Sequence, residues 1–375
     1  MISPTAAQEI ITKNTLQDSV LAHQYAPLDY HLIQAKIKRA ARRPLFRRLA
    51  DAFRGGEKDS LHPRSYSLML FPAYRSDIGW YAGSRFQFDY HSEMSNGRLE
   101  CDADVSFRGD YLALIFGRHT FEDQRYRFEY SVALSSVPVD FWGVGCCAKQ
   151  GDKVSYRRKS YRVDVTLRRS LTNRIFIDIG SCYHKVKSIF NYTDTEGEVV
   201  KGRLYVEYDS RDRELNSQQG VLVRLQGGVA LMPNSWRANF YGSFTLKGFH
   251  KAWQGSVVAY ELYSESCSTG VPWQFWPTTD GEMRFRGYDY GRYIATNLLS
   301  AQVELRQRVY KRLFGYVWGG VGELFMKWRD LRFDNLLPSY GVGLGFAVSK
   351  ECRLRFDYGF GLNSHNFIVN VNEVF

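Results

Sequence analysis

The sequence lacks any apolar run of the roughly 18 residues that a transmembrane helix needs. Its mean hydropathy over 375 residues is −0.36. This excludes a helical membrane protein, but it leaves a membrane β-barrel open, because alternating strands average out as only mildly hydrophobic. With 44% hydrophobic and 24% charged residues, the chain is not a disordered one.

Residues that would bind metal or carry catalysis are scarce. The six cysteines form no CxxC pair and have no histidine at a metal-ligand spacing, so we expect no metal and no cofactor. We interpret the thiols as packing residues or incidental thiols. The eight histidines stand in no GxSxG or HExxH context, so we expect no catalytic residues and no enzyme.

The first residues, MISPTAAQEIITKNT, lack a positively charged start, an apolar stretch and a small-residue cleavage site. They are therefore not a signal peptide. Either the protein stays in the cytoplasm or a signal was removed before this numbering begins. The barrel pattern described below favours removal, and with it the bacterial outer membrane.

The charge is unbalanced, with a net value of +11. Such a charge suits anionic lipid headgroups or nucleic acid. A nucleic-acid binder would gather its basic residues on one face of a recognisable module. Here they are spread along the strand-like segments, so nucleic acid is not an expected partner.

From about Ser65 onward, apolar and polar residues alternate with a period of two, which is typical of strands whose faces meet different surroundings. In the segment 161–168, one face would carry Tyr161, Val163, Val165 and Leu167, and the other Arg162, Asp164, Thr166 and Arg168. A soluble sandwich alternates too, but its strands are usually about 5–6 residues long. Many runs here reach about 9–12 residues, a length that crosses a bilayer when tilted.

We therefore predict an all-β fold: a transmembrane antiparallel β-barrel of about 16 strands over residues 65–375. Aromatic residues gather at the ends of several runs and predict girdles at the two membrane interfaces. These are Trp80 and Tyr81, Phe141 and Trp142, and Trp273 to Trp276.

Residues 1–64 have a different character. They predict a short, basic, helical extension, with two helices interrupted at Pro44 and ended by Gly55 and Gly56. The extension could lie on the membrane surface as an amphipathic helix, fill the barrel lumen as a plug, or act as a solvated tether.

The final segment, NFIVNVNEVF, alternates as a last strand would. One face carries Phe367, Val369, Val371 and Phe375. An aromatic residue at the end of such a strand is similar to the sorting signal that outer-membrane barrels present to their assembly machinery. Glu373 falls on the same apolar face, where the cost is small if it lies near the interface.

The longest gap between the later strands, about Ser264 to Asn297, contains the sequence MRFRGYDYGRY. A loop of this length is usually functional. Inside a lumen, Arg286 would need a carboxylate partner, Gly287 would allow a sharp turn, and Tyr288 would suit a half-wet cavity. Lumen-facing carboxylates on nearby strands are those of Glu304 and Asp357, so we predict that one or both pair with Arg286.

These residues resemble those of the BamA/TamA-type outer-membrane insertases, whose barrels are also called bacterial surface antigens. The Arg286-Gly287-Tyr288 tripeptide matches the tip of a long extracellular loop that folds back into the lumen in that family. Three further segments resemble family motifs and follow one another in the order found in the family. They are VDFWGVG at 139–145, YDSRD with Asp209, Arg211 and Asp212 followed by Gly220, and RLRFDYGFG at 353–361.

The sequence also departs from this family. The family usually places an aspartate before a glycine in the strand that follows the return strand of the loop, where this chain has Trp318. This departure puts the usual pairing of Arg286 in question. The 64 residues before the barrel are too few for the family's polypeptide-transport-associated domains, so the chain resembles a short member of a type associated with Bacteroidota.

The resemblance implies a factor for the assembly and insertion of outer-membrane proteins, including the role of an accessory or specialised subunit, that acts through a seam between its first and last strands. Two other hypotheses stay open: a translocation or diffusion pore gated by the long loop or the N-terminal helix, and a structural subunit of a larger complex. Expected partners are outer-membrane lipid or lipopolysaccharide, client barrels, other assembly-machinery subunits, or a second copy of the chain.

Overall fold

The computed structural model describes residues 64–75, 79–91, 95–121, 125–145, 152–213, 216–233, 235–280, 283–347 and 353–371. The helices predicted within residues 1–64 lie outside the described residues and stay a prediction. Within these ranges, no helix has the length and apolar character needed to span a bilayer.

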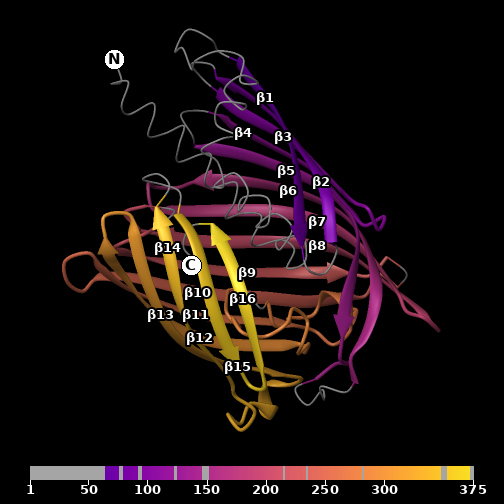
Figure 1. Ribbon diagram of the computed structural model, residues 1–375. Helices are drawn as coiled ribbons and strands as arrows, with labels where there is room; N and C mark the ends of the chain where they lie inside the picture. Colours follow the sequence, from indigo (N-terminus) through magenta and orange to yellow (C-terminus); the bar gives the residue numbers. More distant parts are fainter. Residues whose placement is uncertain are drawn as a thin grey trace.

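Sixteen strands form one antiparallel sheet, in which each strand pairs with its neighbours in the sequence (Figure 1). The strands are β1 (Arg64–Arg75), β2 (Gly79–His91), β3 (Ser95–Ser106), β4 (Tyr111–Phe121), β5 (Tyr126–Phe141), β6 (Val154–Ser170), β7 (Ile175–Ile189), β8 (Asp194–Asp209), β9 (Gly220–Leu231), β10 (Ala238–Lys251), β11 (Ser256–Cys267), β12 (Asn297–Tyr310), β13 (Leu313–Phe325), β14 (Leu337–Ala347), β15 (Arg353–Gly361) and β16 (Ser364–Val371). In the described part of the chain, two 3-10 helices, η2 (Trp273–Phe275) and η3 (Trp328–Asp330), lie in loops. The predicted all-β antiparallel fold of about 16 strands is confirmed.

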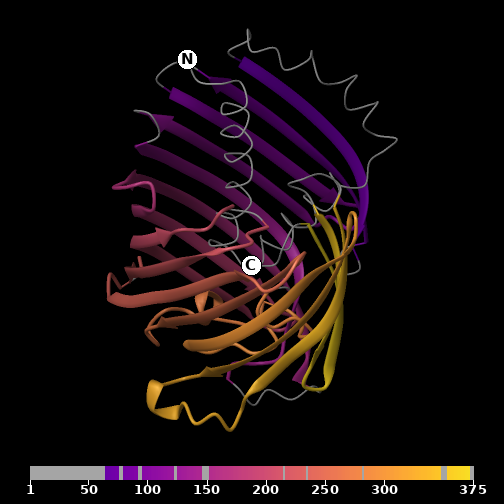
Figure 2. The same ribbon diagram turned by 90° about the vertical axis from the view of Figure 1, so that its left-hand side faces the viewer.

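The sheet curls into a barrel wall that is visible from both directions (Figures 1 and 2). Ladders join every consecutive pair of strands from β1 to β16. Among the described residues no ladder joins β1 to β16, so the sheet is not closed there. The first and last strands therefore present backbone edges.

The two faces of the sheet differ as the alternation predicts. In β6, Leu167 is 47% exposed and its neighbour Arg168 is 6% exposed. The buried, inward residues of this strand are Tyr156, Arg158, Ser160, Arg162, Asp164, Thr166 and Arg168. Apolar side chains thus face outward and charged side chains face the lumen, which is the reverse of a soluble core and suits a lipid surround.

Ion pairs and hydrogen bonds satisfy many of the charges inside the wall. Arg168 donates to both carboxylate oxygens of Asp178 at 2.7 Å, and Arg203 donates to Asp164 at 2.6 Å. Buried charge is tolerated when it is paired in this way. The lumen is therefore lined by a connected ionic network.

The aromatic girdle prediction is wrong for several of the residues that suggested it. Tyr81 is 1% exposed and Trp142 is 3% exposed, so neither faces lipid. Phe141 packs on Trp273 with 4.6 Å between ring centroids, inside the wall. An aromatic side chain at a strand end can face the lipid interface or pack against a loop inside the lumen. The position of aromatic residues in the sequence does not distinguish these two environments.

The outward face gives a direct test of the lipid surround. Val303, at the middle of β12, is 49% exposed on the outward face. We expect Val303→Arg to lower the free energy of unfolding in lipid vesicles by about 2–4 kcal/mol, as a charge near the bilayer midplane does. Urea titration of the vesicle-inserted protein measures it. Val303→Leu is the matched control, and an equally small effect of both changes would contradict the placement.

Candidate functional site

The loop 268–296, between β11 and β12, crosses the lumen and contacts distant parts of the wall. Near its start, Gln274 Nε2 donates to Thr195 Oγ1 of β8 at 3.3 Å. Near its end, the backbone N–H of Gly145, after β5, donates to the carbonyl of Ile294 at 2.7 Å. The VDFWGVG segment noted in the sequence therefore contacts this loop.

The turn at the loop tip is shaped by a single carboxylate. Asp280 Oδ1 accepts hydrogen bonds from the backbone N–H groups of Met283, Arg284 and Phe285, at 3.1, 3.0 and 3.4 Å. A short acidic side chain that satisfies consecutive N–H groups stabilises a tight turn. This turn directs the following residue, Arg286, into the wall.

Arg286 is completely buried, at 0% exposure. Its Nη1 donates to Glu304 Oε2 at 2.8 Å and lies 3.5 Å from Asp357 Oδ2, and its Nη2 donates to Gln302 Oε1 at 3.3 Å. The guanidinium carbon also lies 3.9 Å from the centroid of the Trp318 ring. The structure thus brings Arg286 against both carboxylates that the sequence singled out.

Glu304 is the centre of this cluster. Besides Arg286, it accepts hydrogen bonds from Arg306 Nε at 2.9 Å and from both Nη atoms of Arg355, at 2.9 and 2.7 Å. Arg355 Nε also donates to Asp357 at 2.8 Å. We call Arg286, Glu304, Arg306, Arg355 and Asp357 the lumen cluster. The sequence analysis did not assign Arg306 and Arg355 to the site, although Arg355 shares an inward face with Asp357 at a spacing of two residues.

Trp318 of β13 lies against the guanidinium group of Arg286 in the lumen cluster. It stands directly opposite Glu304 in the β12–β13 ladder, so the carboxylate that meets Arg286 comes from the neighbouring strand. The indole supplies a cation–π contact to Arg286. Its bulk fits because β14 presents glycine: a Cβ on Gly341 would lie 2.5 Å from the Trp318 ring, and one on Gly343 would lie 2.0 Å from Asp357.

Gly287 brings the tip against the backbone of β15. Its φ is +105°, and a Cβ there would lie 2.5 Å from the carbonyl carbon of Phe360. A Cβ on Gly359 would likewise lie 2.8 Å from the Gly287 nitrogen. Both the positive φ and this contact require glycine at the tip.

Tyr288 connects the tip to the last hairpin. Its hydroxyl donates to the Pro338 carbonyl at 2.9 Å and accepts from the backbone N–H of Leu362 at 2.8 Å. Asn366 Nδ2 of β16 donates to the Tyr288 carbonyl at 2.8 Å. Burial raises the pKa of Tyr288 to about 12, so the hydroxyl keeps the proton that it donates.

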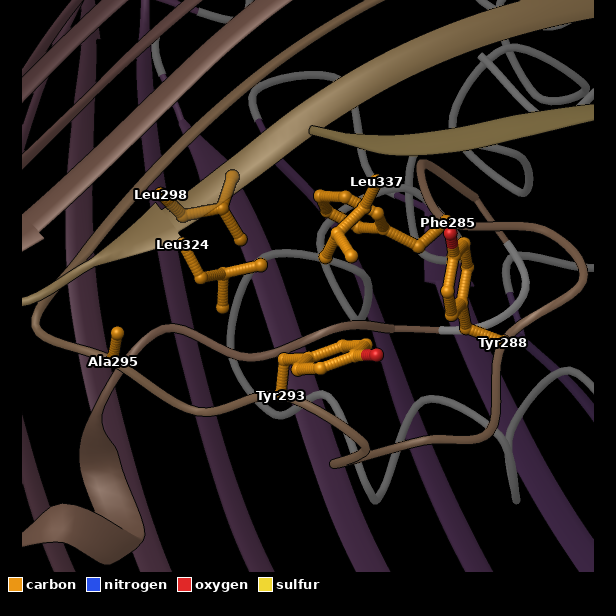
Figure 3. Close-up of a cluster of buried hydrophobic side chains, with 7 residues drawn as sticks. All are labelled: Phe285, Tyr288, Tyr293, Ala295, Leu298, Leu324 and Leu337. Carbon is orange, nitrogen blue, oxygen red and sulfur yellow. The ribbon is translucent and has the colours of Figure 1, made fainter. Parts of the chain in front are cut away.

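An apolar cluster that includes Tyr288 holds the rest of the tip (Figure 3). Loop residues and residues from the adjoining ends of β12, β13 and β14 contribute to it. Its buried members are Phe285, Tyr288, Tyr293, Ala295, Leu298, Leu324 and Leu337. Apolar packing and charge pairing therefore hold the same turn from two sides.

The YDSRD segment forms a turn between β8 and β9. Arg211 Nε and Nη2 donate to the Asp209 carboxylate at 3.0 and 2.8 Å, and Asp212 Oδ1 accepts from the Gln218 N–H at 2.8 Å. Gly220 has a φ of +108°, and a Cβ there would lie 2.6 Å from Arg211 Cα. The motif is thus a self-paired turn and lies at the opposite end of the wall from loop 268–296.

The last strand, β16, ends at Val371 in the described chain. Phe367 is 65% exposed and Ile368 is 5% exposed, so the Phe367 face points outward. Val369 pairs with β15 in the same ladder. Phe375 lies outside the described residues, and its part in a sorting signal stays a prediction.

Comparison with known proteins agrees with this architecture. A family model described as the Omp85 superfamily domain matches residues 96–373. The chain belongs to the Omp85 superfamily. Its β-barrel fold is that of an outer-membrane protein, and the family places it among outer-membrane barrels of the insertase and transporter type.

Solved structures share the fold at low sequence identity. BamA from Haemophilus ducreyi, in a form lacking POTRA domains 1-3, is 12% identical with a TM-score of 0.59, over 82% of this chain and 70% of that one. CdiB from Acinetobacter baumannii is also 12% identical, with a TM-score of 0.50, over 84% of this chain and 61% of that one. This chain therefore spans less than two thirds of the CdiB chain. A search of curated proteins finds no match.

Among the residues of the lumen cluster, Glu304 should contribute most to the stability of the protein. We expect Glu304→Gln to lower the free energy of unfolding by about 3–5 kcal/mol, because it leaves Arg286, Arg306 and Arg355 with too little buried negative charge. The loop should also become cleavable by trypsin at Arg284 or Arg292. Urea titration and mass spectrometry of the digest measure both effects.

Glu196→Gln is the matched control. Glu196 lies on β8 with its side chain 54% exposed, 3.6 Å from Lys185, and a surface pair of this kind contributes only about 0–1 kcal/mol. Equal losses in the two variants would show that the lumen cluster does not hold the loop.

The tip glycine permits a second test. We expect Gly287→Ala to destabilise the protein by at least about 1–3 kcal/mol, since alanine at this φ is strained and its methyl group would collide with β15. Gly202→Ala, where a Cβ meets nothing within 4 Å, should be close to neutral. Thermal unfolding of both variants in detergent is the measurement, and a neutral Gly287→Ala would refute the tight contact.

Proposed function

We propose that this barrel assists the assembly and insertion of other outer-membrane proteins, by offering the open edge of β1 or β16 to an unfolded client strand. The unpaired β1 and β16 edges among the described residues are the observation that carries this proposal. An edge strand presents free N–H and C=O groups with which another strand can pair. Membership of the Omp85 superfamily supports the same proposal.

The loop tip gives the proposed edge a fixed support. Arg286 and Gly287 contact β15, and Tyr288 contacts Leu362 and Asn366 at the β15–β16 hairpin. These contacts reach β16 from the lumen side, and within the described ranges none of them uses its unpaired backbone edge. A client strand would then meet an ordered template, which lowers the entropy cost of pairing.

The proposed partners follow from this role. Client barrels would pair at the edge, outer-membrane lipid or lipopolysaccharide would surround the apolar outer face, and other assembly-machinery subunits or a second copy would supply further contacts. The activity needs no catalytic group and no cofactor, so the proposal is not an enzymatic one.

The test is insertion of a urea-unfolded eight-stranded outer-membrane barrel into liposomes, with and without this protein. Folded client is quantified by its shifted migration on unheated gels. We expect faster folding in the presence of the protein, and slowing when a peptide with the β16 sequence, residues 364–371, is added to occupy the β1 edge.

A peptide with the same residues in scrambled order is the control. Equal client folding with and without the protein contradicts an assembly role. Ion conductance of the protein in planar bilayers, combined with no effect on client folding, would instead favour the pore.

A further inference from the structure

A second site lies at the opposite end of the wall from loop 268–296. A cavity of about 280 Å³ is lined by residues from the β8–β9 and β10–β11 turns and from the adjoining ends of β12, β13 and β15. Because consecutive strands are antiparallel, these turns and ends share the end of the sheet at which β1 begins. We call it the basic cavity.

Among the described residues, the charged side chains that line the basic cavity are all cationic. Four cationic side chains line it: Lys251, Arg306, Arg308 and Arg353. No carboxylate is among the described residues of its lining. Clustered cations in a partly enclosed space raise the local concentration of anions, so the expected ligand is negatively charged.

Several contacts fix these cations in place. Arg353 stacks on Phe314, with its guanidinium carbon 3.9 Å from the ring centroid. Arg306 is 3% exposed and is oriented by its hydrogen bond to Glu304. The site is therefore pre-organised, which reduces the cost of binding.

We propose that the basic cavity binds an acidic segment of another polypeptide through its carboxylate side chains. Arg306 stands on the inward face of β12 with Glu304, and Arg353 shares the inward face of β15 with Arg355 and Asp357, so these cations lie on the lumen side of the sheet and away from the outer, lipid-facing side. Its volume is just below the range typical of whole small-molecule sites and suits individual side chains. The neutral amide side chains of Gln218 and Gln254 can hydrogen-bond a peptide backbone.

The test uses the full chain in detergent micelles and a dye-labelled ten-residue peptide with four consecutive glutamates. A peptide with glutamines at these positions is the matched ligand, and fluorescence anisotropy reports binding. We expect the glutamate peptide to bind at least about tenfold more tightly, and high salt to weaken it. No client is present, so a failed insertion assay and a failed binding assay are separate results.

The variant Arg308→Gln with Arg353→Gln should weaken binding of the glutamate peptide by about tenfold. Arg329→Gln should not, because Arg329 is a cation with a 77% exposed side chain at the other end of the wall. Circular dichroism and gel migration verify folding, and Lys251→Gln replaces the double variant if that one does not fold.

Three results would overturn the proposal. They are equal binding of the two peptides, unchanged binding in a folded cavity variant, and displacement of the peptide by inorganic phosphate at the same concentration of anionic groups. The last result would mean that the basic cavity is a small-anion site only.

Discussion

A guanidinium group that is buried away from water needs anionic partners. This requirement determines which side chains meet in the lumen of the barrel. Arg286 and Arg355 are both 0% exposed, and each is held by Glu304 and Asp357. Removing one member of such a group leaves a buried charge unpaired, whereas the intact group is satisfied. The loop, β12 and β15 of the last hairpin are therefore positioned by one set of contacts.

Space, as well as charge, explains why the cluster has this form. Trp318 covers Arg286, and the ring needs a strand beside it without side chains on its inner face. Gly341 and Gly343 provide this surface on β14. The aromatic residue on β13 is thus accommodated by glycines on β14, and a carboxylate on β12 supplies the pairing of Arg286.

Much of the fold could be predicted from the sequence because period-two alternation is a local signal. It identified the inward set of β6 and the inward carboxylates Glu304 and Asp357 correctly. The contributions of Arg306 and Arg355 were missed, since membership of a cluster depends on which strands face the loop. The aromatic residues Trp142 and Trp273 were misplaced for a related reason: a strand end has no local mark that distinguishes lipid from a filled lumen. The basic cavity is likewise assembled from turns far apart in the chain and has no sequence motif.

The same geometry has a consequence for the order of events during biogenesis. Asp280 can shape its turn as soon as residues 280–285 exist, because every partner is local. The residues that follow this turn are held by contacts with Asp357, Phe360 and Asn366. These three residues are synthesised and exported after the turn itself. The turn can therefore form before the 72 to 81 further residues that separate Phe285 from these partners have arrived. The contacts of this turn with β15 and β16 can therefore form only after the final hairpin has folded into the wall.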